Sequence, residues 1–396
     1  MNIKELPKYW EIKKMPEVVK WSSGGTPKAT EKQYYENGTI PWLIIGDLND
    51  GIVTESASRI TQLGLENSSA KMIPSGTLLV AMYGSIGKLG ITGIECCTNQ
   101  AIAYAKELHG VITKYMYYYM AMMKPKLISM GKGGTQKNIS QSVLNSLDVI
   151  VPPIPEQERI VARIEELFSQ LDSGVETLKK TKEQLAVYRQ AVLKEAFSSC
   201  VERVSVESVC QHVTDGDHMP PPKTKQGIPF IMISNIDNHV IDWSNTAFVG
   251  DEYYNTIDTK RRPSKGDVLY TVTGSYGIPV LIDFEKRFCF QRHIALLRPK
   301  NCINQKFLYY AMQEPAVYAQ ATKGATGTAQ KTVGLAVLRK IRIPFSDDID
   351  TQTEIVNDIE AKLSLCDSIE IIVDTALQQA EAMRQSILKK AFEGEL

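Results

Sequence analysis

Two long segments of the chain repeat apolar residues at alternating steps of three and four positions, the pattern of helices that pack against each other. The first covers about residues 155–199 and the second about 350–393, and prolines stand just before both, where a helix tolerates them. Helices of roughly 40 residues would be about 60 Å long, and neither can bury its apolar stripe alone. The expected core positions are Ile164, Leu171, Leu178 and Leu185 in the first helix and Ile359, Val373 and Ile387 in the second.

We therefore predict that the two helices pair as an antiparallel coiled coil, because the chain between them must return from one to the other. The alternative is that each helix packs separately on its own domain. The rest of the chain mixes short β-type runs, such as 77–82 and 101–105, with glycines and a helix near 114–123. The expected division is a mixed domain at 1–152, a helix at 153–199, a second mixed domain at 200–345 and a second helix at 346–396.

The chain also repeats itself at half its length. Residues 189–197 read RQAVLKEAF and residues 384–392 read RQSILKKAF, a separation of 195 residues. Further matches follow in the same order, pairing 40–44 with 228–232, 76–79 with 266–269, 84–87 with 274–277, 114–118 with 306–310, 134–137 with 327–331 and 157–164 with 352–359. A repeat this long indicates a duplicated domain plus helix. The predicted fold is α+β, with two similar mixed α/β domains separated by two long helices and related by pseudo-two-fold symmetry.

The chain has no net charge, yet its charges are unevenly distributed. Residues 1–150 carry a balance of +4 and residues 200–345 a balance of +5, whereas the two helical segments together carry −9. Local charge sets the field that a phosphate backbone feels. Mildly basic domains beside acidic helices are therefore compatible with nucleic-acid binding, although many enzymes have a similar patch.

Composition and motifs favour a cytoplasmic binding protein. No apolar run approaches the 18 or so residues of a membrane span, the N-terminal residues are too charged for a signal peptide, and the seven cysteines show no C-x-x-C spacing. We find no P-loop, dinucleotide fingerprint, H-E-x-x-H or G-x-S-x-G motif. The five histidines show no metal-ligand spacing. We therefore expect no catalytic residue, no metal and no cofactor in this chain.

Two glycine-rich loops carry the residue types that bind DNA. They are the first glycine loop, 132–138, and the second glycine loop, 323–331, which stand at the same place in the two halves. Glycine allows close backbone approach, lysine neutralises phosphate, and glutamine or asparagine can bond an adenine edge. Ordinary polar turns are the alternative, which the recurrence makes less attractive. The candidate DNA contacts are Thr26, Lys28, Lys132, Thr135, Gln136, Lys137, Asn138, Lys225, Lys323, Thr328, Gln330 and Lys331.

The order of domain, helix, domain, helix resembles the specificity subunit of type I DNA restriction-modification systems. Two motifs carry the resemblance: a proline-rich segment followed by glutamine before each helix, at 153–157 and less regularly at 344–352, and the RQ-x-[VI]-LK-x-AF signature that ends each helix. The resemblance spans essentially the whole chain. It implies that each mixed domain is a target recognition domain reading one half of a split DNA sequence, and that the coiled coil sets the spacer between the halves.

The resemblance also implies the partners. Two methyltransferase subunits would dock on the helices with S-adenosylmethionine and flip an adenine for methylation, and restriction subunits would add an ATP-dependent nuclease. Two alternatives stay open. A self-sufficient methyltransferase would bind S-adenosylmethionine by itself, but its Asn/Asp-Pro-Pro-aromatic tetrapeptide is missing. A coiled-coil scaffold for another ligand would show no salt-dependent affinity for DNA.

Overall fold

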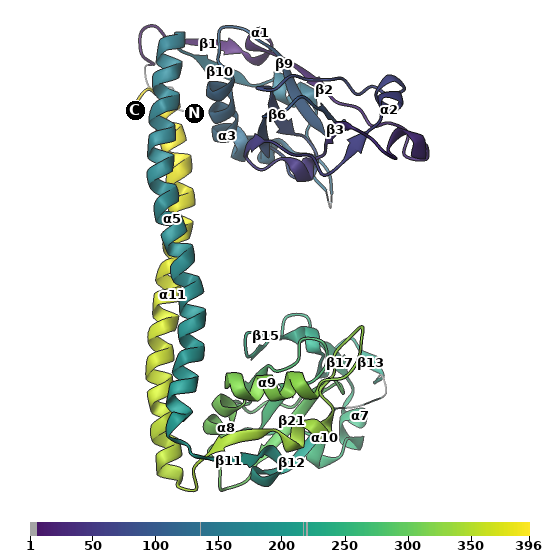
Figure 1. Ribbon diagram of the computed structural model, residues 1–396, viewed down its shortest axis with the longest axis vertical. Helices are drawn as coiled ribbons and strands as arrows, with labels where there is room; N and C mark the ends of the chain where they lie inside the picture. Colours follow the sequence, from purple (N-terminus) through teal and green to yellow (C-terminus); the bar gives the residue numbers. More distant parts are fainter. Residues whose placement is uncertain (1–5, 135, 217, 219–220) are drawn as a thin grey trace. The chain divides into compact units, whose positions relative to one another are not determined.

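The computed structural model describes residues 6–134, 136–216, 218 and 221–396. Packing divides the chain into two compact units. Unit 1 combines Met1–Leu178 with Thr375–Leu396, and unit 2 is Lys179–Asp374. Each unit holds one mixed α/β domain and one part of each long helix (Figure 1).

Unit 1 is built on a five-stranded sheet in the order β2-β9-β6-β7-β4. A smaller sheet has the order β5-β3-β8, and β1 pairs with β10. The strands are β1 (Glu11–Lys14), β2 (Val19–Ser23), β3 (Ile40–Leu43), β4 (Gly51–Val53), β5 (Arg59–Ile60), β6 (Leu78–Ala81), β7 (Leu89–Thr92), β8 (Cys97–Thr98), β9 (Ile102–Leu108) and β10 (Asp148–Val151). The helices of the domain are α1 (Met15–Val18), α2 (Gln62–Glu66), α3 (Thr113–Met130) and α4 (Gln141–Asn145).

Strand β6 shows why this sheet forms. All four of its residues are buried, and alternate side chains enter two different cores. Leu78 and Val80 pack in the core that also holds α3 and the first turns of the long helix. Leu79 and Ala81 face the other core, between the main sheet and the smaller one. The main sheet therefore separates α3 and the long helices from the smaller sheet.

Unit 2 repeats this plan. Its main sheet has the order β12-β21-β18-β19, its smaller sheet the order β13-β17-β14-β20, and β11 pairs with β22. The strands are β11 (Glu202–Ser205), β12 (Cys210–Asp215), β13 (Lys223–Thr224), β14 (Ile228–Ile231), β15 (Ile236–Asp237), β16 (Val240–Ile241), β17 (Ala247–Val249), β18 (Val268–Thr271), β19 (Pro279–Leu281), β20 (Cys289–Phe290), β21 (Ile294–Pro299) and β22 (Arg342–Phe345). The helices are α6 (Val206–Val209), α7 (Asp251–Thr256), α8 (Gln305–Ala311), α9 (Pro315–Gly324) and α10 (Leu335–Lys340).

The sequence repeat is therefore a structural repeat, as predicted. The two domains differ where the sequences differ. Strand β4 extends the main sheet of unit 1, whereas β15 and β16 form a separate hairpin in unit 2. Helix α3 is also continuous, while Pro315 begins a new helix in unit 2, so that α8 and α9 replace it.

The long helices are α5 (Ile154–Ala196) and α11 (Ile349–Phe392), and they pair antiparallel within each unit. In unit 1, Arg159 donates to the carbonyl of Leu396 at 2.8 Å, and Arg384 forms an ion pair with Asp172. In unit 2, Lys182 pairs with Asp374 at 2.8 Å, and Arg189 with Asp367 at 2.6 Å. In both units the numbers rise along α5 as they fall along α11, which confirms the antiparallel prediction.

The predicted core positions lie on the buried side of this pair. Ile164 and Ile359 are fully buried, and Val373 and Leu185 are 3% and 9% exposed. Three further positions are half-buried, because two paired helices bury only a narrow stripe of each other's surface: Leu171, Leu178 and Ile387. The helix boundaries, 154–196 and 349–392, fall inside the predicted segments. The proposed four-part division of the chain stays a prediction.

A buried glutamine fixes each long helix to its domain. The side-chain oxygen of Gln157 accepts from the Ile112 amide at 3.0 Å, and its nitrogen donates to the carbonyls of Gly110 and Pro152, both at 2.8 Å. The side chain of Gln352 repeats this arrangement in unit 2. It accepts from the amide of Asn304 at 2.7 Å and donates to the carbonyls of Cys302 at 3.0 Å and Ser346 at 2.7 Å. The glutamine of the sequence motif therefore attaches the start of each long helix to its domain.

The phenylalanine that ends each helix signature is a second point of attachment between a long helix and a domain. Phe392 lies edge-on to Tyr115 and Tyr119 of α3, with ring centroids 5.1 Å apart in both pairs. Phe197 lies edge-on to Phe307 of α8 at 5.2 Å. Each domain is thus held by the start of one long helix and the end of the other, which accounts for the repetition of both motifs.

Candidate nucleic-acid interface

The first glycine loop is a short hairpin anchored to the end of β6. Lys132 and Asn138 exchange backbone hydrogen bonds of 2.9 and 2.8 Å, which closes the loop. The amide of Gly84 donates to the carbonyl of Lys137 at 3.1 Å, and the amide of Ile139 donates to the carbonyl of Met82 at 2.9 Å. The loop therefore sits on the turn that follows the central strand.

The second glycine loop has the same geometry in unit 2. Thr326 and Thr332 exchange backbone hydrogen bonds of 2.9 and 2.8 Å. The amide of Gly274 donates to the carbonyl of Lys331 at 2.9 Å, and that of Val333 to the carbonyl of Val272 at 2.7 Å. Gln136 and Lys137 of unit 1 thus correspond to Gln330 and Lys331 of unit 2.

Glycine is required at one point of each loop. Gly133 and Gly327 have φ of +130° and +105°, and a Cβ on either would lie 2.4 Å from a backbone oxygen across the loop. The geometry pairs Gly133 with Gly327, whereas the sequence repeat aligns Gly134 with Gly327, so the alignment of this glycine is wrong by one residue. The cause is that residues 133 and 134 are both glycine, and the sequence alone does not show which of the two has the positive φ that matches Gly327.

The glycine loops expose most of their candidate side chains. Lys132, Gln136 and Lys137 are exposed in unit 1, and Lys323, Thr328, Gln330 and Lys331 are exposed in unit 2. Asn138 is half-buried and its side-chain oxygen accepts from the Gly84 amide at 3.3 Å, so this residue holds the loop together. Thr135 lies outside the described residues.

The candidates near residue 26 belong to a neighbouring loop at the same end of the main sheet. Thr26 donates a hydrogen bond to the side-chain oxygen of Gln100, in the turn between β8 and β9. That turn is joined to β6, because Met82 donates to the carbonyl of Ala101 at 2.8 Å. Lys28 is exposed and lies 3.3 Å from Glu31, an ion pair that competes with phosphate.

Lys225 stands apart from the other candidates. It is exposed between β13 and β14, which are strands of the smaller sheet. Among the described residues, no hydrogen bond or ion pair joins its side chain to the second glycine loop.

A further turn lies beside each glycine loop and carries no motif in the sequence: it joins β8 to β9 in unit 1 and β20 to β21 in unit 2. In unit 2 this turn holds Arg292 and His293, and the amide of Val272 donates to the carbonyl of His293 at 2.9 Å. Gln100 and Ala101 occupy the same place in unit 1. The equivalent residues of the two turns differ, so the sequence repeat does not reveal that the turns correspond. Only the strand pairing shows that each turn lies beside a glycine loop.

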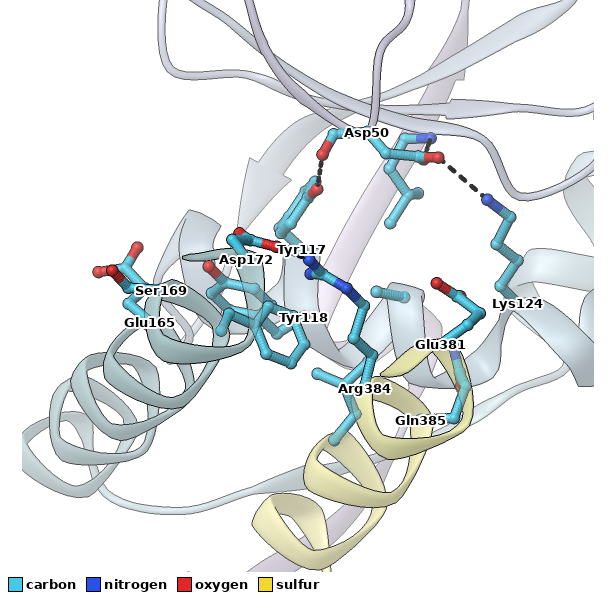
Figure 2. A pocket seen from close by; sticks show the side chains of 14 residues that line it. Asp50, Tyr117, Tyr118, Lys124, Glu165, Ser169, Asp172, Glu381, Arg384 and Gln385 are labelled. Carbon is cyan, nitrogen blue, oxygen red and sulfur yellow. Dashed lines mark hydrogen bonds and ion pairs between the residues drawn. The ribbon is translucent and has the colours of Figure 1, made fainter. Parts of the chain in front are cut away.

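Unit 1 also contains a hollow of about 630 Å³ between α3 and the two long helices (Figure 2). Tyr117 donates to the carbonyl of Asp50, whose carboxylate pairs with Lys124 at 3.1 Å. Arg384 pairs with Asp172. Burial, with the nearby Asp50 carboxylate, raises the pKa of Tyr117 to about 12, so this hydroxyl keeps its proton. The polar groups of this hollow already bond to one another, so we interpret the hollow as part of the packing between the domain and the helices.

Two further observations concern the described residues alone. They include no group of three or more histidine, cysteine, aspartate or glutamate side chains that could hold a metal ion. Nor do they include a helix long and apolar enough to cross a membrane.

A duplicated domain with paired loops, held on paired helices, defines a class of protein built from two copies of one module. The family model of the type I restriction modification DNA specificity domain matches the chain twice, at residues 7–186 and 202–370. The chain belongs to this family. Its curated relatives are named as specificity subunits, the non-catalytic targeting subunits of type I restriction enzymes, and this chain is of the same kind.

Two curated relatives serve as examples of this similarity. The EcoKI specificity subunit of Escherichia coli K12 is 22% identical over 433 residues, covering 100% of this chain and 91% of the relative. The MjaIX specificity subunit of Methanocaldococcus jannaschii is 27% identical over 201 residues, covering 50% of this chain and 45% of the relative.

Solved structures share the fold. A chain from work described as "Structural basis underlying complex assembly and conformational transition of the type I R-M system" superposes with a TM-score of 0.76 at 17% identity, covering 99% of this chain and 100% of the other. The HsdS subunit from Thermoanaerobacter tengcongensis gives a TM-score of 0.52 at 17% identity, covering 100% and 99%.

Proposed function

We propose that this chain binds a bipartite double-stranded DNA target, with each unit reading one half-site. The observation that carries the proposal is the duplicated glycine loop, which presents an exposed glutamine and an exposed lysine at equivalent positions of both units. Glutamine can bond both edge atoms of an adenine in the major groove. Lysine neutralises a phosphate and releases its counterions. Two equivalent loops on domains of different sequence suit two half-sites of different sequence.

The long helices supply the second part of the proposal. With 43 and 44 residues, each is about 65 Å long if straight, and adjacent half-sites one turn apart are about 34 Å from centre to centre. Both helices pass from one unit into the other along the chain. Their length would therefore fix the number of unread base pairs between the half-sites.

The partners complete the proposed function. Two methyltransferase subunits would dock on this chain and carry S-adenosylmethionine, and restriction subunits would carry ATP. The family relation and the names of the relatives support this division of labour.

Replacing the loop lysines tests the DNA-binding surface. Lys137→Ala and Lys331→Ala should each weaken DNA binding and lower the slope of log affinity against log salt by about one unit, because each removes one phosphate contact. The measurement is a salt titration of duplex binding by the complex with the methyltransferase subunits. Lys389→Ala, an exposed lysine at the end of α11, is the control and should leave the slope unchanged. Slopes equal to wild type in both loop variants would remove the glycine loops from the interface.

A further inference from the structure

Arg292 occupies a fixed position at the end of the main sheet of unit 2. Its turn joins β20 to β21, and the next residue, His293, is bonded through its carbonyl to Val272. On the other side, the backbone of Gly216 packs so closely on the turn that a Cβ there would lie 2.1 Å from the carbonyl oxygen of Phe290. Val272 also accepts from Val333, which follows the second glycine loop. Arg292 therefore lies beside the loop that carries Gln330 and Lys331.

The side chain of Arg292 is exposed and forms no hydrogen bond or ion pair with the residues that the structure describes. The other twelve arginines each form a hydrogen bond or an ion pair with a described residue. Two examples are Arg298, which bonds Asp267 at 2.7 Å, and Arg287, which pairs with Asp251 at 2.7 Å. Among the residues that the structure describes, none bonds the Arg292 guanidinium. An exposed arginine at a candidate interface, without a partner among the described residues, can bond a ligand.

The charge state of the neighbouring His293 also favours contact between Arg292 and a ligand. Partial burial and the adjacent Arg292 lower the pKa of His293, so the imidazole is neutral near pH 7 and leaves Arg292 as the cation of the turn. An exposed guanidinium with five N–H donors matches the two acceptors on the major-groove edge of guanine, O6 and N7.

We propose that Arg292 reads a guanine in the half-site bound by unit 2. This inference rests on the proposed function and names one base of the target. In unit 1 the equivalent residue is Gln100, because Ala101 and His293 hold the same place beside β6 and β18. The side-chain oxygen of Gln100 already accepts a hydrogen bond from Thr26, so it is not free for the paired contact with adenine. The two units therefore read different bases with the same turn.

The test combines motif sequencing with competition binding. The target is first determined from the adenines methylated by this chain with its cognate methyltransferase subunit. Purified complexes carrying wild type, Arg292→Gln or Arg292→Lys are then competed against target duplexes in which each base pair is substituted in turn. Arg287→Gln is the matched control, because it removes the same charge from an exposed arginine that is paired with Asp251.

We expect wild type to discriminate against substitution of one guanine by roughly tenfold to a hundredfold, and Arg292→Gln to lose that discrimination at this position alone. The Arg287→Gln complex should discriminate as wild type does. An Arg292→Gln complex that stays as strict as wild type at every guanine would overturn this inference while leaving the proposed function intact. A wild-type motif that is not bipartite would overturn both.

Discussion

Removing seven residues from each long helix should shorten the spacer of the methylated motif by up to about three base pairs. The deletions are 175–181 in α5 and 375–381 in α11. A heptad of helix is about 10 Å long, and base pairs are 3.4 Å apart along the duplex. The half-sites themselves should not change, because both domains keep their sequences.

These deletions preserve the packing of the helix pair. Arg384 keeps Asp172 as its partner within unit 1, and Lys182 keeps Asp374 within unit 2. The buried Val373 and the half-buried Ile387 become neighbours one heptad apart, so the apolar register is retained.

Duplication of the same two heptads is the matched experiment and should lengthen the spacer by a similar amount. Sequencing of methylated adenines in cells that carry each variant and its methyltransferase subunit measures the spacer directly. If both the shortened and the lengthened chains methylate the wild-type motif, the helices do not set the spacer.

Replacing either buried glutamine, Gln157 or Gln352, with leucine should lower the free energy of unfolding by about 3–5 kcal/mol. Three hydrogen bonds are lost in each case, and buried backbone groups are left without partners. Gln157→Leu would strand the Ile112 amide and the carbonyls of Gly110 and Pro152. Gln352→Leu would do the same to the residues around Asn304 in unit 2. Leucine has nearly the volume of glutamine, so the loss reports the polar contacts more than a cavity.

Urea unfolding followed by circular dichroism measures this effect. Gln170→Leu, at an exposed position of α5, is the control and should change stability by less than about 0.5 kcal/mol. A loss in Gln157→Leu as small as in the control would show that the glutamine motif does not hold helix to domain.

The sequence predicted those parts of the fold that rest on period and repetition. The 3.5-residue period located both helices, and the buried Ile164 and Ile359 confirm it. The long repeat predicted two domains of one plan. It also singled out the glycine loops, whose exposed Gln136 and Gln330 stand in equivalent places.

Residues whose importance depends on strand pairing could not be found this way. Arg292 and Gln100 share neither identity nor chemistry, and only the pairing of β18 with β21 and of β6 with β9 reveals that they are equivalent. The hydrogen bond from the Gly84 amide to the Asn138 side chain could not be predicted from the sequence either, and Asn138 stays a predicted DNA contact. Lys225 lies between two strands of the smaller sheet, and it also stays a predicted DNA contact.

The central claim is that this chain gives a methyltransferase its bipartite DNA target. The most direct measurement is to sequence methylated adenines in cells that carry the cognate methyltransferase gene, with and without the gene for this chain. We predict a bipartite motif that disappears when this gene alone is deleted. Methylation at the same motif in its absence, or none in its presence with the partner expressed, would contradict the account.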